Sequence, residues 1–369
     1  MPRSRPPLTT LAAFCAVAFL PACGPGDGPP GRAAGERDIL VERLVELDDG
    51  DSPILARPVE VSTDSRGRWF IADRSDKDIK VYGRDGKRIL AVGRPGHGPG
   101  EFAVLLGAQT YRDSLAAFDV VGAKLNVFSP EGRYARSFSL ARKGLGAPFE
   151  VRVVDDSLFL TVAALPGGEG GNLLALRRPD GSIKSTFFDQ SRYFGNSPAL
   201  IQLSGVVADA AHGVVFAAVA GADSVWAFDY AGHRLGAAQV DPAAPLVTTK
   251  SLLARNGGKG QRPDGSWVVD GNRMLFGMVA LDSATVAMQV APFDAKAGVD
   301  LIEGGTMIFA GLDADGGLRM LAREEVTGGL LGRDRAGAPL LVRYAGAEAD
   351  RYDVVRIRLV PRATDAWAP

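Results

Sequence analysis

A repeat with a period of about fifty residues constrains this chain more than any other feature. In the clearest copy, a turn over Asp64–Gly67 precedes the strand-like run Trp69–Asp73, and a second run, Ile79–Tyr82, leads to Asp85 and Gly86. Equivalent turn glycines follow at positions 132, 181 and 232, which gives separations of 46, 49 and 51 residues. Six units are recognised, with openings at residues 64, 113, 156, 209, 282 and 334.

Each unit has the pattern of a small antiparallel sheet. A Gly after a β-rich run supplies the positive φ that a tight hairpin needs, and a fourth run follows it, for example Arg88–Val92. Four-stranded units that recur in this way cannot bury both faces alone, so they pack around an axis. We therefore predict an all-β protein, a six-bladed β-propeller with four-stranded blades. The sixth unit lacks an outer strand, and the run Ile39–Leu47 is expected to close this last blade as an N-terminal strand.

The first residues indicate export. Arg3 and Arg5 precede the uncharged run LTTLAAFCAVAFLPA, which is short for a membrane-spanning helix and typical of a signal peptide over residues 1–22. The run ends at Cys23 in a sequence that resembles the lipobox of bacterial lipoproteins, with Pro21 as a departure from that pattern. The resemblance implies that Cys23 is lipidated and anchors the protein to a bilayer. The alternative is a plain secretory cleavage site and free secretion.

The remaining domain organisation follows from composition. Residues 23–37 are rich in Gly and Pro and are expected to form a flexible tether. The propeller is expected over residues 38–361, with an insertion at about 243–273, and residues 362–369 form a C-terminal tail. Cys15 would be lost with the signal peptide, so no disulfide is expected in the mature chain. The predicted location is the periplasmic side of a membrane in the cell envelope.

The junction between the first two units carries a family resemblance. The segment Val92–Phe102 resembles the glycine-rich junction of NHL-repeat proteins, and with Ile79–Tyr82 the chain is similar to six-bladed propeller lipoproteins of bacterial envelopes. The later units match by spacing and residue type. The resemblance implies a propeller that binds a partner, and some propellers of this kind are enzymes.

Composition argues against several classes. The chain has 42 Lys and Arg against 43 Asp and Glu, so no overall charge favours nucleic acid, and we expect no nucleic-acid partner. Only three His are present, in different turns, which argues against a zinc lyase. No nucleophile elbow or phosphate loop motif occurs.

Asp73 and Asp119 are the candidates for a metal site. They recur at the same place in units one and two, and gluconolactonase-like propellers hold calcium through acidic and amide side chains in the channel. Units three and four have Ala163 and Ala220 near this place, so the acidic ring is incomplete. A structural role at the next turn is the stronger interpretation. We expect no cofactor, with calcium as the alternative.

Two further regions are candidates for ligand binding. The insertion between units four and five contains a basic cluster with Arg262 and the aromatic Trp267, and a junction insertion is expected beside the channel mouth as a lid or a binding lip. Tyr193 and Asn196, between units three and four, are expected to line the same mouth. A solvated loop and core packing are the structural alternatives for these two regions.

The sequence thus favours a monomeric, lipid-anchored propeller that acts as a non-catalytic binding or protein-interaction platform, with an envelope protein, peptide or glycan as partner. The alternative is a calcium-dependent hydrolase or lyase of the gluconolactonase or strictosidine-synthase-like type, with Asp73 and Asp119 near the metal.

Overall fold

A computed structural model describes residues 37–48, 55–140, 148–163, 171–189, 191–192, 205–294, 303–313, 315–345 and 351–361. The chain divides into two units, Met1–Ala34 and Gly35–Pro369. The first unit lies outside the described residues, and so do the predicted signal peptide, Cys23, the C-terminal tail, and nearly all of the tether. All strands of the described residues belong to the second unit.

The strands form four-stranded antiparallel sheets in chain order, here called blades 1 to 6. Blades 1 and 2 contain β2 (Pro58–Thr63), β3 (Trp69–Asp73), β4 (Asp78–Tyr82), β5 (Arg88–Val92), β8 (Leu105–Tyr111), β9 (Ser114–Asp119), β10 (Lys124–Phe128) and β11 (Tyr134–Ser139). Blades 3 and 4 contain β12 (Pro148–Asp155), β13 (Leu158–Ala163), β14 (Asn172–Arg177), β15 (Ile183–Asp189), β16 (Val206–Ala211), β17 (Val214–Val219), β18 (Val225–Asp229) and β19 (Arg234–Ala238).

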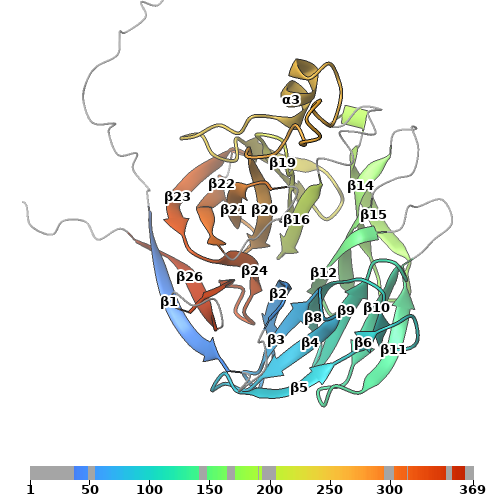
Figure 1. The fold of residues 1–369 in the computed structure, drawn as a ribbon. Coiled ribbons are helices and arrows are strands. Elements are labelled where there is room, and N and C mark those ends of the chain that lie inside the picture. The colour runs from blue at the N-terminus through green and yellow to red at the C-terminus, as the bar shows by residue number, and fades with distance from the viewer. Residues whose placement is uncertain are drawn as a thin grey trace, which may run out of the picture. The chain divides into compact units, whose positions relative to one another are not determined.

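Blade 5 contains β20 (Arg273–Ala280), β21 (Thr285–Pro292), β22 (Gly305–Leu312) and β23 (Leu318–Val326). Blade 6 contains β24 (Gly329–Arg333), β25 (Pro339–Tyr344), β26 (Tyr352–Pro361) and β1 (Arg37–Leu47). Strand β1 pairs antiparallel with β26 along its length, and Figure 1 shows these two strands side by side. The predicted closure of the last blade by the N-terminal strand is therefore confirmed.

The blades form a closed ring around a channel. The inner strands β2, β8, β12, β16, β20 and β24 contact one another in this order, and β24 returns to β2, where Val61 pairs with Gly332 (Figure 1). The inner strands all run in the same direction along the channel. Their C-terminal ends therefore meet at one face of the ring and their N-terminal ends at the other. This arrangement confirms the predicted β-propeller.

Stability comes from packing between blades. Among the described residues, six clusters of buried apolar side chains are present, and each joins two neighbouring blades, including blade 6 with blade 1. Phe216, for example, is fully buried between blades 4 and 5, and Phe309 is fully buried between blades 5 and 6. One blade cannot bury these residues alone, which is the physical reason for the repeat.

The turn chemistry follows the sequence prediction. Gly86, Gly132, Gly181 and Gly232 have φ values of 80°, 80°, 80° and 93°, where a residue with a Cβ is strained. The glycine-rich junction between blades 1 and 2 closes on its own chain, because Gly98 N donates to Glu101 Oε2 at 2.9 Å. Here β6 (Arg94–Pro95) and β7 (Glu101–Phe102) form a short parallel pair.

The insertion between blades 4 and 5 contains the helix α3 (Thr249–Arg255), which Thr248 caps by accepting a hydrogen bond from Ser251 N. Its apolar residue Leu253 packs on the core between these blades. Among the described residues, no helix has the length and apolar character needed to cross a membrane.

Candidate functional site

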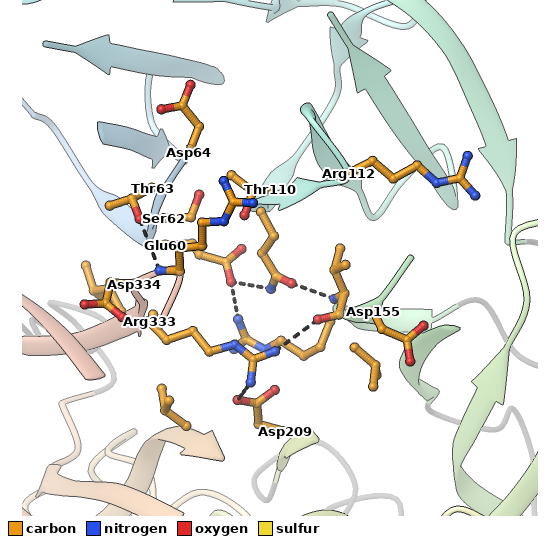
Figure 2. Close-up of a pocket in the computed structure, with 18 of the residues that line it drawn as sticks. Glu60, Ser62, Thr63, Asp64, Thr110, Arg112, Asp155, Asp209, Arg333 and Asp334 are labelled. Carbon is orange, nitrogen blue, oxygen red and sulfur yellow. Dashed lines mark hydrogen bonds and ion pairs between the residues drawn. The ribbon is translucent and has the colours of Figure 1, made fainter. Parts of the chain in front are cut away.

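A cavity of about 510 Å³ opens at the face where the inner strands end. Every blade contributes to its wall, with side chains from the last residues of the inner strands and the turns that follow them (Figure 2). The lining side chains include Glu60, Ser62, Thr63, Asp64, Gln109, Thr110, Arg112, Asp113, Arg152, Asp155, Asp156, Asp209, Met278, Val279, Leu331, Arg333, Asp334 and Arg335. We call this cavity the channel-mouth pocket.

A buried ionic network closes the floor of this pocket. Arg152, on β12, is placed between Glu60 from β2 and Glu150 from its own strand, and its NH2 lies 2.7 Å from Glu150 Oε1. Gln109, on β8, donates to Glu60 and accepts a hydrogen bond from Val153 N at 2.6 Å. The inner strands of blades 1, 2 and 3 are thereby joined across the channel.

A second pair joins the other side of the floor. Arg333, at the end of β24, lies 3.4 Å from Asp209 Oδ2 and donates to Val153 O at 3.1 Å (Figure 2). Asp209, on β16, also accepts from the backbone N atoms of Ala210 and Ala280, both at 2.9 Å. These bonds tie blades 3, 4, 5 and 6 together at the same depth.

Burial shifts the ionisation of this network. Burial raises the pKa of the Glu60 carboxyl, while Arg152 and Gln109 oppose this rise in part. Burial raises the pKa of Glu150 in the same way, and Arg152 again opposes it. Burial lowers the pKa of Arg152, but the attraction of Glu150, Glu60 and Asp209 outweighs it and holds that pKa above its usual value. Removing either member of such a buried pair is costly.

Gly107 on β8 leaves the space that Glu60 occupies. A Cβ at position 107 would lie 2.3 Å from Glu60 Oε2, which is closer than real Cβ contacts. The backbone at Gly107 has no positive φ, so the steric requirement alone explains the glycine. The position of the Glu60 carboxylate therefore depends on the neighbouring blade.

The pocket wall is mainly polar. Blades 1 and 2 contribute hydroxyl groups, including those of Ser62 and Thr110. Blades 5 and 6 contribute Met278, Val279 and Leu331, but these side chains are buried in the cores between blades and expose little apolar surface to the pocket. The contacts that this pocket offers are therefore chiefly polar.

Asp73 and Asp119 lie at the other end of the channel. Each ends the second strand of its blade and is paired with the first residue of the inner strand, Pro58 or Leu105. Asp73 is fully buried, and its carboxylate accepts hydrogen bonds from Ala56 N at 2.6 Å and from three further backbone N atoms, and contacts Lys80 Nζ at 3.1 Å.

Asp119 has the same role in blade 2. It accepts from Val104 N at 3.1 Å, just before β8. In both blades this carboxylate holds the backbone that leads into the inner strand. Within the described residues, no group of three His, Cys, Asp or Glu side chains is arranged to hold a metal ion. The two aspartates thus have the geometry of structural residues.

The insertion also lies away from the pocket. Ala238, where β19 ends, pairs with Val225, and Val225 is paired with Ala218, which pairs with Val207 at the start of β16. Both ends of the insertion are therefore at the face where inner strands begin. The insertion, which is predicted to lie beside the channel mouth, thus has its ends at the mouth opposite the pocket, because the outer strands return the chain to that face.

Arg262 and Trp267 serve the fold of the insertion. Arg262 donates to Val268 O at 3.0 Å, to Ser266 Oγ at 3.2 Å and to Trp267 O. The half-buried Trp267 packs against the core between blades 4 and 5. The other two candidates, Tyr193 and Asn196, lie outside the described residues.

Sequence reasoning missed the residues of the pocket floor. Their signal is a charged residue inside an apolar inner strand, as in Val59-Glu60-Val61, Val151-Arg152-Val153 and Ala208-Asp209-Ala210. Glu60 and Arg152 each lie four residues before a unit opening, at 64 and 156, and Asp209 is itself the opening residue of the fourth unit. A buried charge in such a place needs a partner.

The fold and the pocket define a β-propeller with a polar site in its channel, above a buried ionic network. The sequence matches no family model and no curated protein. Two solved structures share the fold over most of their length. One is a candidate exported protein from Bacteroides fragilis, with 10% identity, coverage of 87% of this chain and 95% of that one, and a TM-score of 0.56. The other is a member of the DUF4221 family from Bacteroides vulgatus, with 9% identity, coverage of 89% and 100%, and a TM-score of 0.55.

Proposed function

We propose that this protein is an exported, lipid-anchored β-propeller that acts as a non-catalytic binding platform in the cell envelope, and that the channel-mouth pocket is its binding site. The observation that carries the proposal is the closed-floored cavity of about 510 Å³, which is within the range of small-ligand sites. The partner is an envelope protein, peptide or glycan that places a small group in this cavity.

Several features support binding without catalysis. Ion pairs fix the charged side chains of the floor, Glu60 with Arg152 and Asp209 with Arg333. The floor is therefore a rigid surface that is already formed before a ligand binds. Loops and turns on a rigid ring are where binding residues concentrate. Export is supported by the sequence over residues 1–22, and lipidation by Cys23.

Crosslinking from inside the pocket tests the binding site. A photoreactive amino acid replaces Thr110 in the pocket, and the matched control replaces Thr186, which is exposed on the outer strand of blade 3. In intact cells, we expect a specific adduct from position 110 and none from position 186. Equal adducts at both positions, or none at 110, would contradict the proposed site.

Lipidation is tested separately. Metabolic labelling with an alkyne-bearing fatty acid should label the wild type and leave Cys23→Ser unlabelled, and the variant should leave the membrane fraction. An unlabelled wild type would show that Cys23 follows a plain secretory cleavage site.

The calcium-dependent hydrolase or lyase is the alternative, and metal content decides it. If the purified protein contains near-stoichiometric calcium, and calcium raises its melting temperature, lactone and ester substrates should be screened. If it contains none and calcium leaves melting unchanged, the binding platform is favoured.

A further inference from the structure

We propose that the face of the ring that holds the channel-mouth pocket is turned toward the membrane, and that the pocket receives the glycan head of a glycolipid in the same bilayer. This inference rests on the proposed function, because it takes Cys23 as the lipid anchor and the pocket as the binding site. It follows from three features: the face at which the chain enters the ring, the reach of the tether and the lining of the cavity.

The chain enters the propeller at the face that holds the pocket. Strand β24 ends at this face, and each further strand of blade 6 runs antiparallel to its neighbour. Strand β25 therefore starts at this face, β26 ends there and β1 starts there. The first residue of β1, Arg37, pairs with Pro361, the last residue of β26. The tether thus joins the ring on the side of the pocket.

A second cavity shows how close Arg37 is to the pocket. This cavity of about 460 Å³ lies between blades 5 and 6, and Arg37 lines it together with Asp282 and Asp334. These two aspartates belong to the turns that follow the inner strands β20 and β24. Asp334 also lines the channel-mouth pocket. The point where the tether joins the ring is therefore beside the mouth of the pocket.

The length of the tether limits how the ring can stand on the bilayer. Residues 23–36 connect the anchor to β1, and a flexible, Gly-rich chain of this length has a root-mean-square reach of about 20 Å. The two faces of the ring are separated by about 26 Å, the length of an inner strand of 8 residues such as β20. An average tether therefore brings the pocket face to the bilayer, whereas the opposite face would need a tether extended along the side of the ring.

The lining of the pocket favours a glycan. Hydroxyl and amide groups of Ser62, Gln109 and Thr110 lie beside the paired charges of the floor, so donors and acceptors are close together. A sugar hydroxyl both donates and accepts hydrogen bonds, so it can bind at either kind of group. Among the described residues that line this cavity, none is aromatic, and the aromatic anchor of a partner protein would find little apolar surface.

Anionic phospholipid head groups fit this face less well than a neutral glycan. Protein surfaces that bind such head groups carry clusters of Lys and Arg. At the rim of the pocket, Arg112 and Arg335 lie among three carboxylates, those of Asp113, Asp155 and Asp156. These carboxylates oppose an anionic head group and do not oppose a neutral glycan. The glycan head of a glycolipid therefore combines the chemistry of the pocket with the position of the anchor.

Energy transfer from the ring to the bilayer tests the orientation. Ser283 is exposed on the pocket face of blade 5, and Ser75 is exposed on the opposite face of blade 1, so each lies in a blade next to blade 6. The mature chain has no cysteine besides Cys23, whose thiol the lipid occupies. Ser283→Cys and Ser75→Cys therefore each accept a single fluorophore in the full-length, lipidated protein.

The labelled proteins are reconstituted in phosphatidylcholine vesicles that carry an acceptor dye on a lipid head group. We expect the transfer efficiency from position 283 to be at least about twofold higher than from position 75, because the two faces differ in height by about the length of an inner strand. Equal transfer, or higher transfer from position 75, would overturn the proposed orientation. A wild type without lipid would refute the anchor and this inference with it.

Crosslinking in cells tests the partner. The photoreactive residue at position 110 is compared in the anchored protein and in a released form, which has a plain secretory signal peptide in place of residues 1–22 and Cys23→Ser. A shared bilayer raises the effective concentration of the partner, so the anchored form should give at least about tenfold more adduct. Mass spectrometry should identify the adduct as a glycan with an attached lipid.

The outcomes separate this inference from the proposed function. Equal adducts from the anchored and released forms would show a partner that is free of the membrane, and an adduct with a protein would show that the pocket does not take a glycolipid. Either result would refute this inference and leave the channel-mouth pocket as a binding site. The absence of an adduct from both forms would refute the proposed site as well.

Discussion

The exchange Gly107→Ala probes the ionic floor from a neighbouring blade. The added Cβ would lie 2.3 Å from Glu60 Oε2, so the carboxylate must move by about 1 Å to reach ordinary contact distance. This movement weakens the contacts of Glu60 with Arg152 and Gln109. Losing a partner of a buried pair costs about 3–5 kcal/mol, and Ala recovers about 0.4–1 kcal/mol by restricting the unfolded chain. We expect the free energy of unfolding to fall by about 2–4 kcal/mol.

Urea unfolding followed by circular dichroism measures this change. Gly205→Ala is the matched control, because nothing lies within 4 Å of its Cβ and its φ is not positive, so it should be neutral or slightly stabilising. In the double variant with Glu60→Ala the clash is absent, so the losses of unfolding free energy caused by Gly107→Ala and by Glu60→Ala should not add. If Gly107→Ala is within about 0.5 kcal/mol of the wild type, the floor is not rigidly packed and the reasoning fails.

Three further predictions concern stability. Burial raises the pKa of Asp241, but hydrogen bonds from Arg273 and Arg323 outweigh this effect and hold the pKa below its ordinary value. The ionised Asp241 therefore stabilises the fold above the ordinary carboxyl pKa, and this stabilisation is lost as pH falls through the lowered pKa. The melting temperature of Asp241→Asn should depend less on pH in this acidic range than that of the wild type. Asp73→Asn removes a charged acceptor for backbone N atoms and for Lys80. Its melting temperature should fall below that of the wild type by the same amount in calcium and in EDTA. A larger fall in calcium would indicate a metal site. Leu47→Ala should lower the free energy of unfolding by about 2–5 kcal/mol, because the fully buried side chain packs where β1 closes blade 6. Denaturant titration measures this loss. A smaller loss would show that the N-terminal strand is dispensable.

A sequence indicates local structure most directly, and the fold was predictable on that basis. Turn glycines such as Gly86 and Gly232 repeat because a tight hairpin requires positive φ at one position. Six such units need one another to bury their apolar faces, so the ring and its closure by β1 follow from the count of strands. These are properties of nearest neighbours along the chain and of the repeat.

The candidate site could be predicted only in part. The repeat predicts that Asp73 and Asp119 are equivalent, and the structure places them at equivalent positions in blades 1 and 2. The sequence alone does not say which face of the ring such a position reaches. An aspartate at the end of a strand, which the sequence suggests as a channel residue, can instead hold the backbone that precedes the inner strand.

Repetition therefore determined the fold from the sequence by itself: local turn chemistry and alternating apolar runs permit few other ways to bury the faces of six small sheets. Only the tertiary structure decided the site. Glu60, Arg152, Asp209 and Arg333 come from four blades and are up to 273 residues apart in the chain, between positions 60 and 333. Their meeting depends on the ring closing, because Glu60 of blade 1 is paired with Arg152 of blade 3, and Asp209 of blade 4 is paired with Arg333 of blade 6.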